Sequence, residues 1–455
     1  MIGAAELRRT SKVAAAVAAV DVAKRIPAGA EGNSVSVSPV DIVQPKAAMK
    51  SRSSYLGAFG ALSVYCGSAM LVGAAMLAGR AGLPPADGQG WVCESASWEE
   101  ALLNAAVQWD GVSYAGIACN GYTQGSAELP NTVFFPLYPL LAAAFHQATS
   151  ADVRQSLILI SHISLAMAFV LFWTYLRRGS RAAQFPVSWV VLAFAFFPTT
   201  FFWRMAYTES LFILLCLLVL VGIQRQWPVS VVAIVVGAAT ATRPVGVALL
   251  APLALYGWRR GAGRAAAAAR LMWTLPLGAW GLLAYAVFLW ASFGDPLCFA
   301  KTQKQWRPRA WAPMSEKVFA LASWEPIWSV YDPRSTAYWR RFDKHCNPFI
   351  SLQFANPLYF VGVAALVAVG ASKRWLNEYE TLLGVCLLLI PYVFHSYEAC
   401  MIGHGRYASV VVPVYIVLGQ LLARLPAVAA GLVLAGFAAM LGIYSALFAA
   451  GYWLI

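Results

Sequence analysis

Charged residues are scarce in this chain of 455 residues. Asp, Glu, Lys and Arg make up 12% of the sequence, whereas 60% of the residues are hydrophobic. Soluble domains carry about twice that share of charge. Several apolar runs reach the length of about 20 residues that a helix needs to cross a bilayer. The composition therefore excludes an ordinary soluble domain and predicts an all-α polytopic membrane protein.

Several familiar motifs are missing as well. The sequence contains no Walker loop, no dinucleotide-binding glycine fingerprint and no zinc-ligand spacing. We therefore expect no cofactor and no bound metal. The net charge of +13 is better explained by cytoplasmic loops and anionic lipid than by nucleic acid. Membrane lipids are thus expected partners, and nucleic acid is not.

The eight cysteines include no Cys-x-x-Cys pair. Several lie in or near connecting loops: Cys93, Cys119, Cys298, Cys346 and Cys400. If these loops face an oxidising compartment, a bridge between Cys93 and Cys119 is one option. An unpaired odd cysteine is an equal alternative, because sequence alone does not give connectivity.

The first 54 residues are polar and basic and contain no run long enough to span a membrane. We expect residues 1–54 to form a flexible cytoplasmic tail, with an organelle transit peptide as the alternative. The transmembrane domain then covers residues 55–455 and opens with a span from Tyr55 to Gly79. Because basic residues precede this span, the loop that follows it is expected outside.

A short apolar run, 134–145, decides the topology of the rest. If this run crossed the membrane, Arg177, Arg178 and Arg181 would lie outside. Treated as an interfacial helix, it leaves these arginines inside, as the positive-inside rule prefers. This choice predicts external loops at 80–152 and 294–349 and about eleven transmembrane helices. The expected spans are 55–79, 156–176, 184–203, 208–224, 229–242, 245–258, 271–293, 351–370, 381–394, 407–422 and 427–447.

The first external loop contains the segment SWEEALLNAAVQW. Ser97 followed three residues later by Glu100 is typical of a helix start. We expect a short amphipathic helix that lies along the membrane and delivers Asp110 at its end.

Polar side chains near the membrane converge on the outer face in this topology. Asp110 and Glu209 are candidate acid/base carboxylates. Four cations are candidates for holding a phosphate: Arg243, Lys301, Lys304 and Arg406. The other candidate substrate-binding residues are Trp109, Tyr207, Asp295, Gln303 and His404. One carboxylate with several cations at a membrane face suits transfer from a lipid phosphate.

Each candidate also has a purely structural interpretation. Asp110 can cap a helix, and Glu209 stands at a helix start where its charge favours the dipole. Arg243 precedes Pro244 at a tight turn. Asp295 follows a glycine and precedes Pro296, which is a turn pattern. The convergence of these residues on one face is what favours function.

The motifs resemble those of the PIG-V family, the second mannosyltransferase of GPI-anchor assembly and its bacterial relatives. WDGVSYAGIACNGY and FFPLYPLL come first, and AYTESLF, ATRPVG, FGDPLCFAKTQKQW and GRYASVVVPVY follow in the family's order. The similarity covers most of the chain from about Tyr55 onward. It implies a GT-C fold, with interfacial helices in the first external loop. It also implies a polyprenyl- or dolichyl-phosphate sugar, typically mannose, as donor.

On this resemblance Asp110 takes the place of the acidic residue in the WD motif and Glu209 that in the YTES motif. Gly111 follows Asp110 where many GT-C enzymes have a second acidic residue, which leaves no adjacent pair for a metal. Family members often carry endings such as MGRY, so Arg406 carries over better than His404.

We therefore expect an inverting glycosyltransferase with Asp110 as general base, acting on a lipid-linked or glycan acceptor. The alternatives are another sugar, or a non-catalytic lipid-glycan transporter or assembly subunit. Transporters usually show paired repeats, and none is evident here. The expected location is the plasma membrane in a bacterium or the endoplasmic reticulum in a eukaryote. The sequence does not decide whether a small membrane subunit is a partner.

Overall fold

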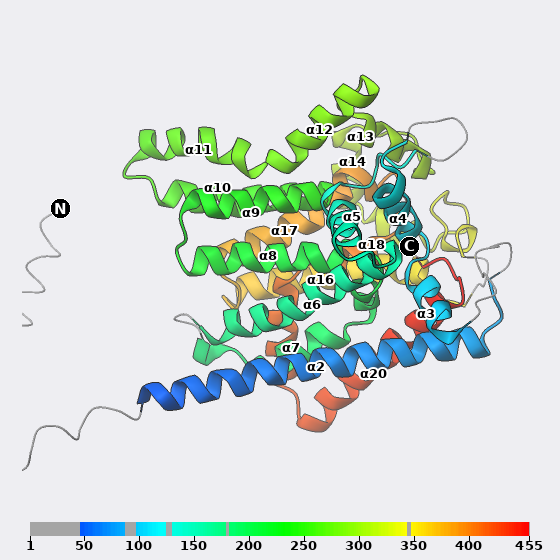
Figure 1. Ribbon diagram of the computed structural model, residues 1–455, viewed down its shortest axis with the longest axis horizontal. Coiled ribbons are helices and arrows are strands. Elements are labelled where there is room, and N and C mark those ends of the chain that lie inside the picture. Colours follow the sequence, from blue (N-terminus) through cyan, green and yellow to red (C-terminus); the bar gives the residue numbers. More distant parts are fainter. Residues whose placement is uncertain (1–45, 87–96, 124–129, 179–181, 344–346, 455) are drawn as a thin grey trace, which may run out of the picture. The chain divides into compact units, whose positions relative to one another are not determined.

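A computed structural model describes residues 46–86, 97–123, 130–178, 182–343 and 347–454 (Figure 1). Its regular elements are all helices, and no strand occurs in the described ranges. The chain divides into two compact units, 1–53 and 54–455. The second unit carries every contact discussed below. The all-α fold class is confirmed.

Five helices are long and apolar enough to cross a membrane. They are α2 (Lys46–Gly82, apolar from Gly57), α6 (Val153–Arg177), α16 (Leu352–Ser372), α17 (Glu378–Pro391) with the π-helical η6 (Tyr392–Ser396), and α20 (Ala427–Ala449). Their number and composition are those of a multi-pass membrane protein.

Two further expected spans are sharply bent. α7 (Val187–Phe196) and η2 (Pro198–Arg204) meet at 74°, and α11 (Arg264–Gly278) and α12 (Trp280–Phe293) meet at 53°. The first break precedes Pro198, which has no N–H to continue the helix. The Arg204 guanidinium donates to the carbonyls of Ala195 and Thr200 at this break, at 3.4 and 2.9 Å.

The remaining apolar runs form shorter helices. These are α8 (Glu209–Gln224), α9 (Val229–Thr242), α10 (Leu250–Arg259) after the 3₁₀ turn η3 (Pro244–Leu249), and α19 (Pro413–Leu422). The prediction of about eleven full spans is therefore not confirmed: length and composition support five, or seven if each bent pair is one span. Nearly all of α8 is buried by other helices. An apolar run in this chain can therefore lie in the protein interior as well as against lipid.

Loops rich in arginine gather at one end of the helices. Gln224 donates to the carbonyl of Arg178 at 2.9 Å, and Arg260 donates to that of Gln226 at 2.9 Å. Arg259 forms an ion pair with Glu378. The opposite end carries the short helices α3 (Trp98–Ala106), α4 (Asp110–Asn120), α5 (Leu137–Thr149) and α18 (His404–Ser409) (Figure 1). The positive-inside rule predicts that the end with the short arginine-rich loops is cytoplasmic.

The loop predicted to be the first external one contains α3 (Trp98–Ala106), α4 (Asp110–Asn120) and α5 (Leu137–Thr149). Ser97 Oγ accepts from the Glu100 N–H at 3.2 Å, which confirms the predicted helix start. The predicted end of this helix is wrong: α3 ends at Ala106 and does not continue through Trp109. Asp110 is instead the first residue of the next helix, α4. α5 has 13 residues, which at 1.5 Å each is too short for a bilayer core of about 30 Å.

The second loop predicted to be external, 294–349, follows α12. It contains α13 (Cys298–Thr302), η4 (Gln303–Trp306), α14 (Met314–Ala322), α15 (Glu325–Trp328) and η5 (Trp339–Arg341). η1 (Ala182–Gln184) precedes α7, and α18 (His404–Ser409) precedes α19. No disulfide joins any of the described cysteines. Cys93 and Cys346 lie outside the described residues, as does most of the predicted tail.

Candidate active site

A tight turn between α3 and α4 places Asp110. Trp109 adopts a φ of 56°, which a non-glycine residue rarely does. Such a conformation costs about 1–2 kcal/mol and persists only where the surroundings impose it. One restraint is a hydrogen bond from the Ala206 N–H to the Ala106 carbonyl, at 2.9 Å. The turn therefore fixes Asp110 as the first residue of α4.

Asp110 belongs to a network of four charged side chains from four separate segments. Arg406 Nη1 of α18 lies 2.5 Å from Asp110 Oδ2. The Nε of the same arginine binds Glu209 Oε1, at the start of α8. Arg243 Nη1, at the end of α9, lies 2.5 Å from that Glu209 oxygen. The WD, YTES, TRP and GRY motifs thus meet at one place.

The network is balanced in charge and mostly buried. Two guanidinium groups face two carboxylates, and the side chain of Glu209 is 0% exposed whereas that of Asp110 is 24% exposed. Burial lowers the pKa of Arg406, but the carboxylates of Glu209 and Asp110 outweigh this effect and raise it overall. Arg406 is therefore held firmly in its charged form. A buried ion cluster of this kind is tolerated only when every charge is paired.

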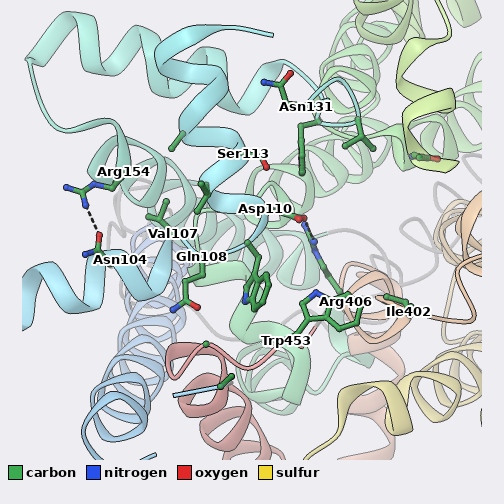
Figure 2. A pocket seen from close by; sticks show the side chains of 18 of the residues that line it. Asn104, Val107, Gln108, Asp110, Ser113, Asn131, Arg154, Ile402, Arg406 and Trp453 are labelled. Carbon is green, nitrogen blue, oxygen red and sulfur yellow. Dashed lines mark hydrogen bonds and ion pairs between the residues drawn. The ribbon is translucent and has the colours of Figure 1, made fainter. Parts of the chain in front are cut away.

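A cavity of about 670 Å³ opens beside the network (Figure 2). Asp110 and Arg406 form part of its wall, and Figure 2 shows their side chains pointing toward one another. The volume is within the range of small-molecule binding sites. Further polar lining comes from Asn104, Gln108, Ser113, Asn131, Arg154, Gln303 and His395. Much of the rest is apolar, including Val107, Val112, Val133, Phe134 and Ile402.

One carboxylate oxygen is left for chemistry. Asp110 Oδ2 is bound by Arg406, whereas Oδ1 has no hydrogen-bond partner within the described ranges. Since the side chain is partly exposed to the cavity, this oxygen can accept a proton from a bound hydroxyl.

Comparison with protein-family models, characterised proteins and solved structures finds no match for this chain. No group of three or more His, Cys, Asp or Glu residues in the described part of the chain has a metal-binding arrangement.

The other predicted site residues divide into three groups. Trp109 and Gln303 line the cavity together with Asp110 and Arg406. Tyr207 and His404 are fully buried and do not line the cavity, and His404 Nδ1 lies 3.0 Å from Ser396 Oγ. The Arg406 guanidinium lies 4.4 Å from the centre of the Tyr207 ring, so that tyrosine supports the arginine directly.

The third group lies away from the cavity wall. Asp295 and Lys301 form an ion pair at 2.6 Å, with Lys301 largely exposed. Lys304 is exposed too, and none of the three lines the cavity. Glu209 and Arg243 also lie behind the wall, because Asp110 and Arg406 separate their charges from the cavity. The geometry thus gives Asp110 and Glu209 different surroundings.

Several cavity residues were not predicted. His395 is one, and its position as a lone histidine in the apolar run PYVFHSYEAC was an available signal, because ionisable residues in apolar runs are costly. Tyr407 directly follows a predicted residue. Trp453 carried no signal, since nothing in the sequence indicates that the C-terminal residues return to the site.

Proposed function

We propose that this protein is a membrane glycosyltransferase with a polyprenyl- or dolichyl-phosphate sugar as donor and a hydroxyl of a lipid-linked or glycan molecule as acceptor. Mannose is the first sugar to test, because the motifs resemble those of a mannosyltransferase family. The observation that carries the proposal is the position of Asp110. Its carboxylate is anchored by Arg406 through one oxygen, and the residue lines a ligand-sized cavity.

The reaction is an inverting displacement. The acceptor hydroxyl attacks the anomeric carbon of the sugar while its proton passes to Asp110 Oδ1. The bond between the anomeric carbon and the phosphate oxygen breaks, and the lipid phosphate leaves with the bonding electrons. Arg406 keeps the carboxylate aimed at the hydroxyl. Glu209 is a positioning residue in this scheme, since it binds Arg406 and Arg243 and does not reach the cavity.

The surroundings suit a lipid-linked substrate. The cavity wall combines apolar side chains with amides and cations, as a ligand with a lipid part and a polar part requires. The cavity is lined by residues of α3, α4 and α18, and Figure 1 places these helices at the end opposite the loop that joins α10 and α11. The positive-inside rule predicts that this end is the external or lumenal side.

The test uses purified protein in liposomes with a lipid extract from its own source. Radiolabelled polyprenyl-phosphate mannose is one donor, polyprenyl-phosphate glucose the second, and a nucleotide sugar the third. We expect label from a polyprenyl-phosphate sugar to appear in a new covalent product. Movement of donor between leaflets with no product would instead support the transporter alternative. No product with any donor would contradict the proposal.

A further inference from the structure

The charged network beside the cavity has no positive charge to spare. Arg406 and Arg243 are matched by Glu209 and Asp110, and a lipid phosphate brings at least one further negative charge. A buried charge without a partner is strongly unfavourable. Arg154, another cavity residue, already forms an ion pair with Asp152 at 3.0 Å. The phosphate must therefore be held by other groups.

Arg307 has the charge that is needed. One of its Nη atoms donates to the carbonyl of Phe394 at 2.8 Å and to Gln303 Oε1 at 3.3 Å, both of which are neutral oxygens. Its Nε is buried and has no hydrogen-bond partner among the described residues. Glu398 acts on Arg307 through space, but its ion pair is with Lys317. Arg307 is thus a cation whose hydrogen bonds leave its charge uncompensated.

Arg307 does not line the cavity itself, but the two residues that accept hydrogen bonds from its side chain lead to it. Gln303 lines the cavity, and because its oxygen accepts from Arg307, its amide NH₂ remains available to donate. His395 follows Phe394 and also lines the cavity, and its Nδ1 is buried without a partner in the described part of the chain. Unpaired buried polar atoms are rare in folded proteins and call for an explanation.

We propose that Gln303, Arg307 and His395 form an anion subsite that binds the phosphate of the polyprenyl-phosphate substrate. This inference rests on the proposed function and adds where the phosphate lies. The subsite supplies hydrogen-bond donors and a positive charge without a carboxylate of its own, which matches the needs of a phosphate. The sugar then extends from this subsite toward Asp110 on another part of the wall.

The backbone around His395 is built to hold it in place. His395 lies in η6, the π-helical turn that closes with a hydrogen bond from the Tyr397 N–H to the Tyr392 carbonyl at 3.2 Å. Such turns are frequent at functional sites. Lys317 Nζ donates to the Val393 carbonyl at 2.6 Å and Arg307 donates to the Phe394 carbonyl at 2.8 Å, so the segment after α12 holds the two residues that directly precede His395.

The experiment measures binding, separately from transfer. Full-length protein in detergent is titrated with polyprenyl monophosphate, with polyprenol and with inorganic phosphate, and tryptophan fluorescence reports the affinity. Wild type should bind the monophosphate more tightly than either comparator. Arg307→Gln should weaken monophosphate binding by about tenfold or more, the scale of one lost charge-assisted contact, and leave polyprenol binding unchanged.

Two further variants keep the test decisive. Gln303→Glu retains the contact with Arg307, but the new carboxylate neutralises the charge of the arginine. It should therefore weaken monophosphate binding as Arg307→Gln does. Arg340→Gln removes an exposed arginine of the same segment, whose guanidinium lies over the Trp339 ring, and should bind as wild type. Unchanged monophosphate binding by both subsite variants would overturn the subsite. Equal affinity of wild type for inorganic phosphate would overturn the lipid source of the anion.

The two proposals can fail independently. Normal phosphate binding without sugar transfer by wild type would contradict the proposed function and leave the anion subsite standing. Normal transfer by wild type, together with unchanged monophosphate binding in Arg307→Gln and Gln303→Glu, would contradict the anion subsite and leave the proposed function standing.

Discussion

Asp110 and Glu209 carry the same charge in the same network, yet their environments assign them different tasks. Glu209 is fully buried between two guanidinium groups, whereas Asp110 is partly exposed and binds one. Removing the buried charge leaves an uncompensated guanidinium in the interior. Removing the exposed one leaves Arg406 still paired with Glu209.

We predict that Glu209→Gln lowers the stability of the protein by about 3–5 kcal/mol, the usual cost of breaking a buried ion pair. Asp110→Asn should cost much less, although both variants should lose transfer. The measurement is the midpoint of thermal unfolding in detergent for both variants. Equal midpoints for the two would show that the difference in burial has no energetic consequence.

His404 gives a prediction about pH. Burial lowers the pKa of His404 to about 3, with the nearby His395 acting in the same direction, whereas the ordinary value is 6.5. Below pH 6.5 the unfolded chain binds a proton that the folded chain does not, so stability falls as the pH drops from 6.5 toward 3. The contribution is fully present above 6.5.

At pH 5.5 the expected loss from this one residue is about 1.4 kcal/mol. In wild type, His404 Nδ1 and Ser396 Oγ are 3.0 Å apart and share a hydrogen bond. His404→Asn keeps a polar partner for Ser396 and removes the ionisable imidazole. We expect the thermal midpoint of wild type to fall further than that of His404→Asn between pH 7.5 and pH 5.5. Parallel decreases in the two proteins would contradict the assignment.

Individual site residues could be predicted from the sequence where a motif contains the reactive or charged side chain. Asp110 and Arg406 were found in this way, and they meet at the cavity. Asp295 and Lys301 had the same motif support but pair with each other on the surface. Arg307 and His395 lie 88 positions apart, and only the fold brings them together, so their proximity could not be read from spacing.

Among the elements, the segment between α12 and α16 and the turn before α18 are joined by a buried ion pair. Lys317 and Glu398 are 1% and 0% exposed, and the ammonium group of Lys317 also lies over the Trp311 ring at 3.8 Å. Glu398 precedes the positive-φ residues Cys400 and Met401, which lead into α18. The pair therefore fixes the approach to Arg406.

We predict that Lys317→Met and Glu398→Gln each destabilise the protein by about 3–5 kcal/mol, because each leaves one partner buried and unpaired. The double variant should recover part of the loss, since no unpaired charge remains. Thermal unfolding of the four proteins gives the coupling. Additive losses in the double variant would mean that the two residues act independently.

Local sequence signals predicted some elements well. Ser97 and Glu100 gave the start of α3, and the length of the run after Phe134 correctly indicated that it is too short to span. The predicted number of spans is not confirmed, because hydropathy does not distinguish lipid from a protein interior. Pro198 marks one break, but the fate of the short helices α8 and α9 depends on neighbours that are distant in sequence.

For the whole molecule, the proposed topology places the cavity and the short arginine-rich loops after α6, α8 and α10 on opposite sides of the membrane. We predict that Trp98→Cys and Ser315→Cys react with an impermeant maleimide from one side of sealed vesicles. Lys373→Cys should react only from the other side. The native cysteines are replaced first, since Cys66 and Cys119 are exposed. Labelling of Ser315→Cys and Lys373→Cys from the same side would contradict this topology.

In the proposed mechanism, Asp110 accepts the proton of the attacking hydroxyl. The most direct measurement is the single-turnover rate of label transfer from polyprenyl-phosphate sugar, for wild type, Asp110→Asn and Asp332→Asn, which makes the same change on an exposed turn. We expect Asp110→Asn to transfer at least about a hundredfold more slowly, the usual contribution of general base catalysis, with Asp332→Asn unchanged. Transfer by Asp110→Asn at the wild-type rate would contradict the account.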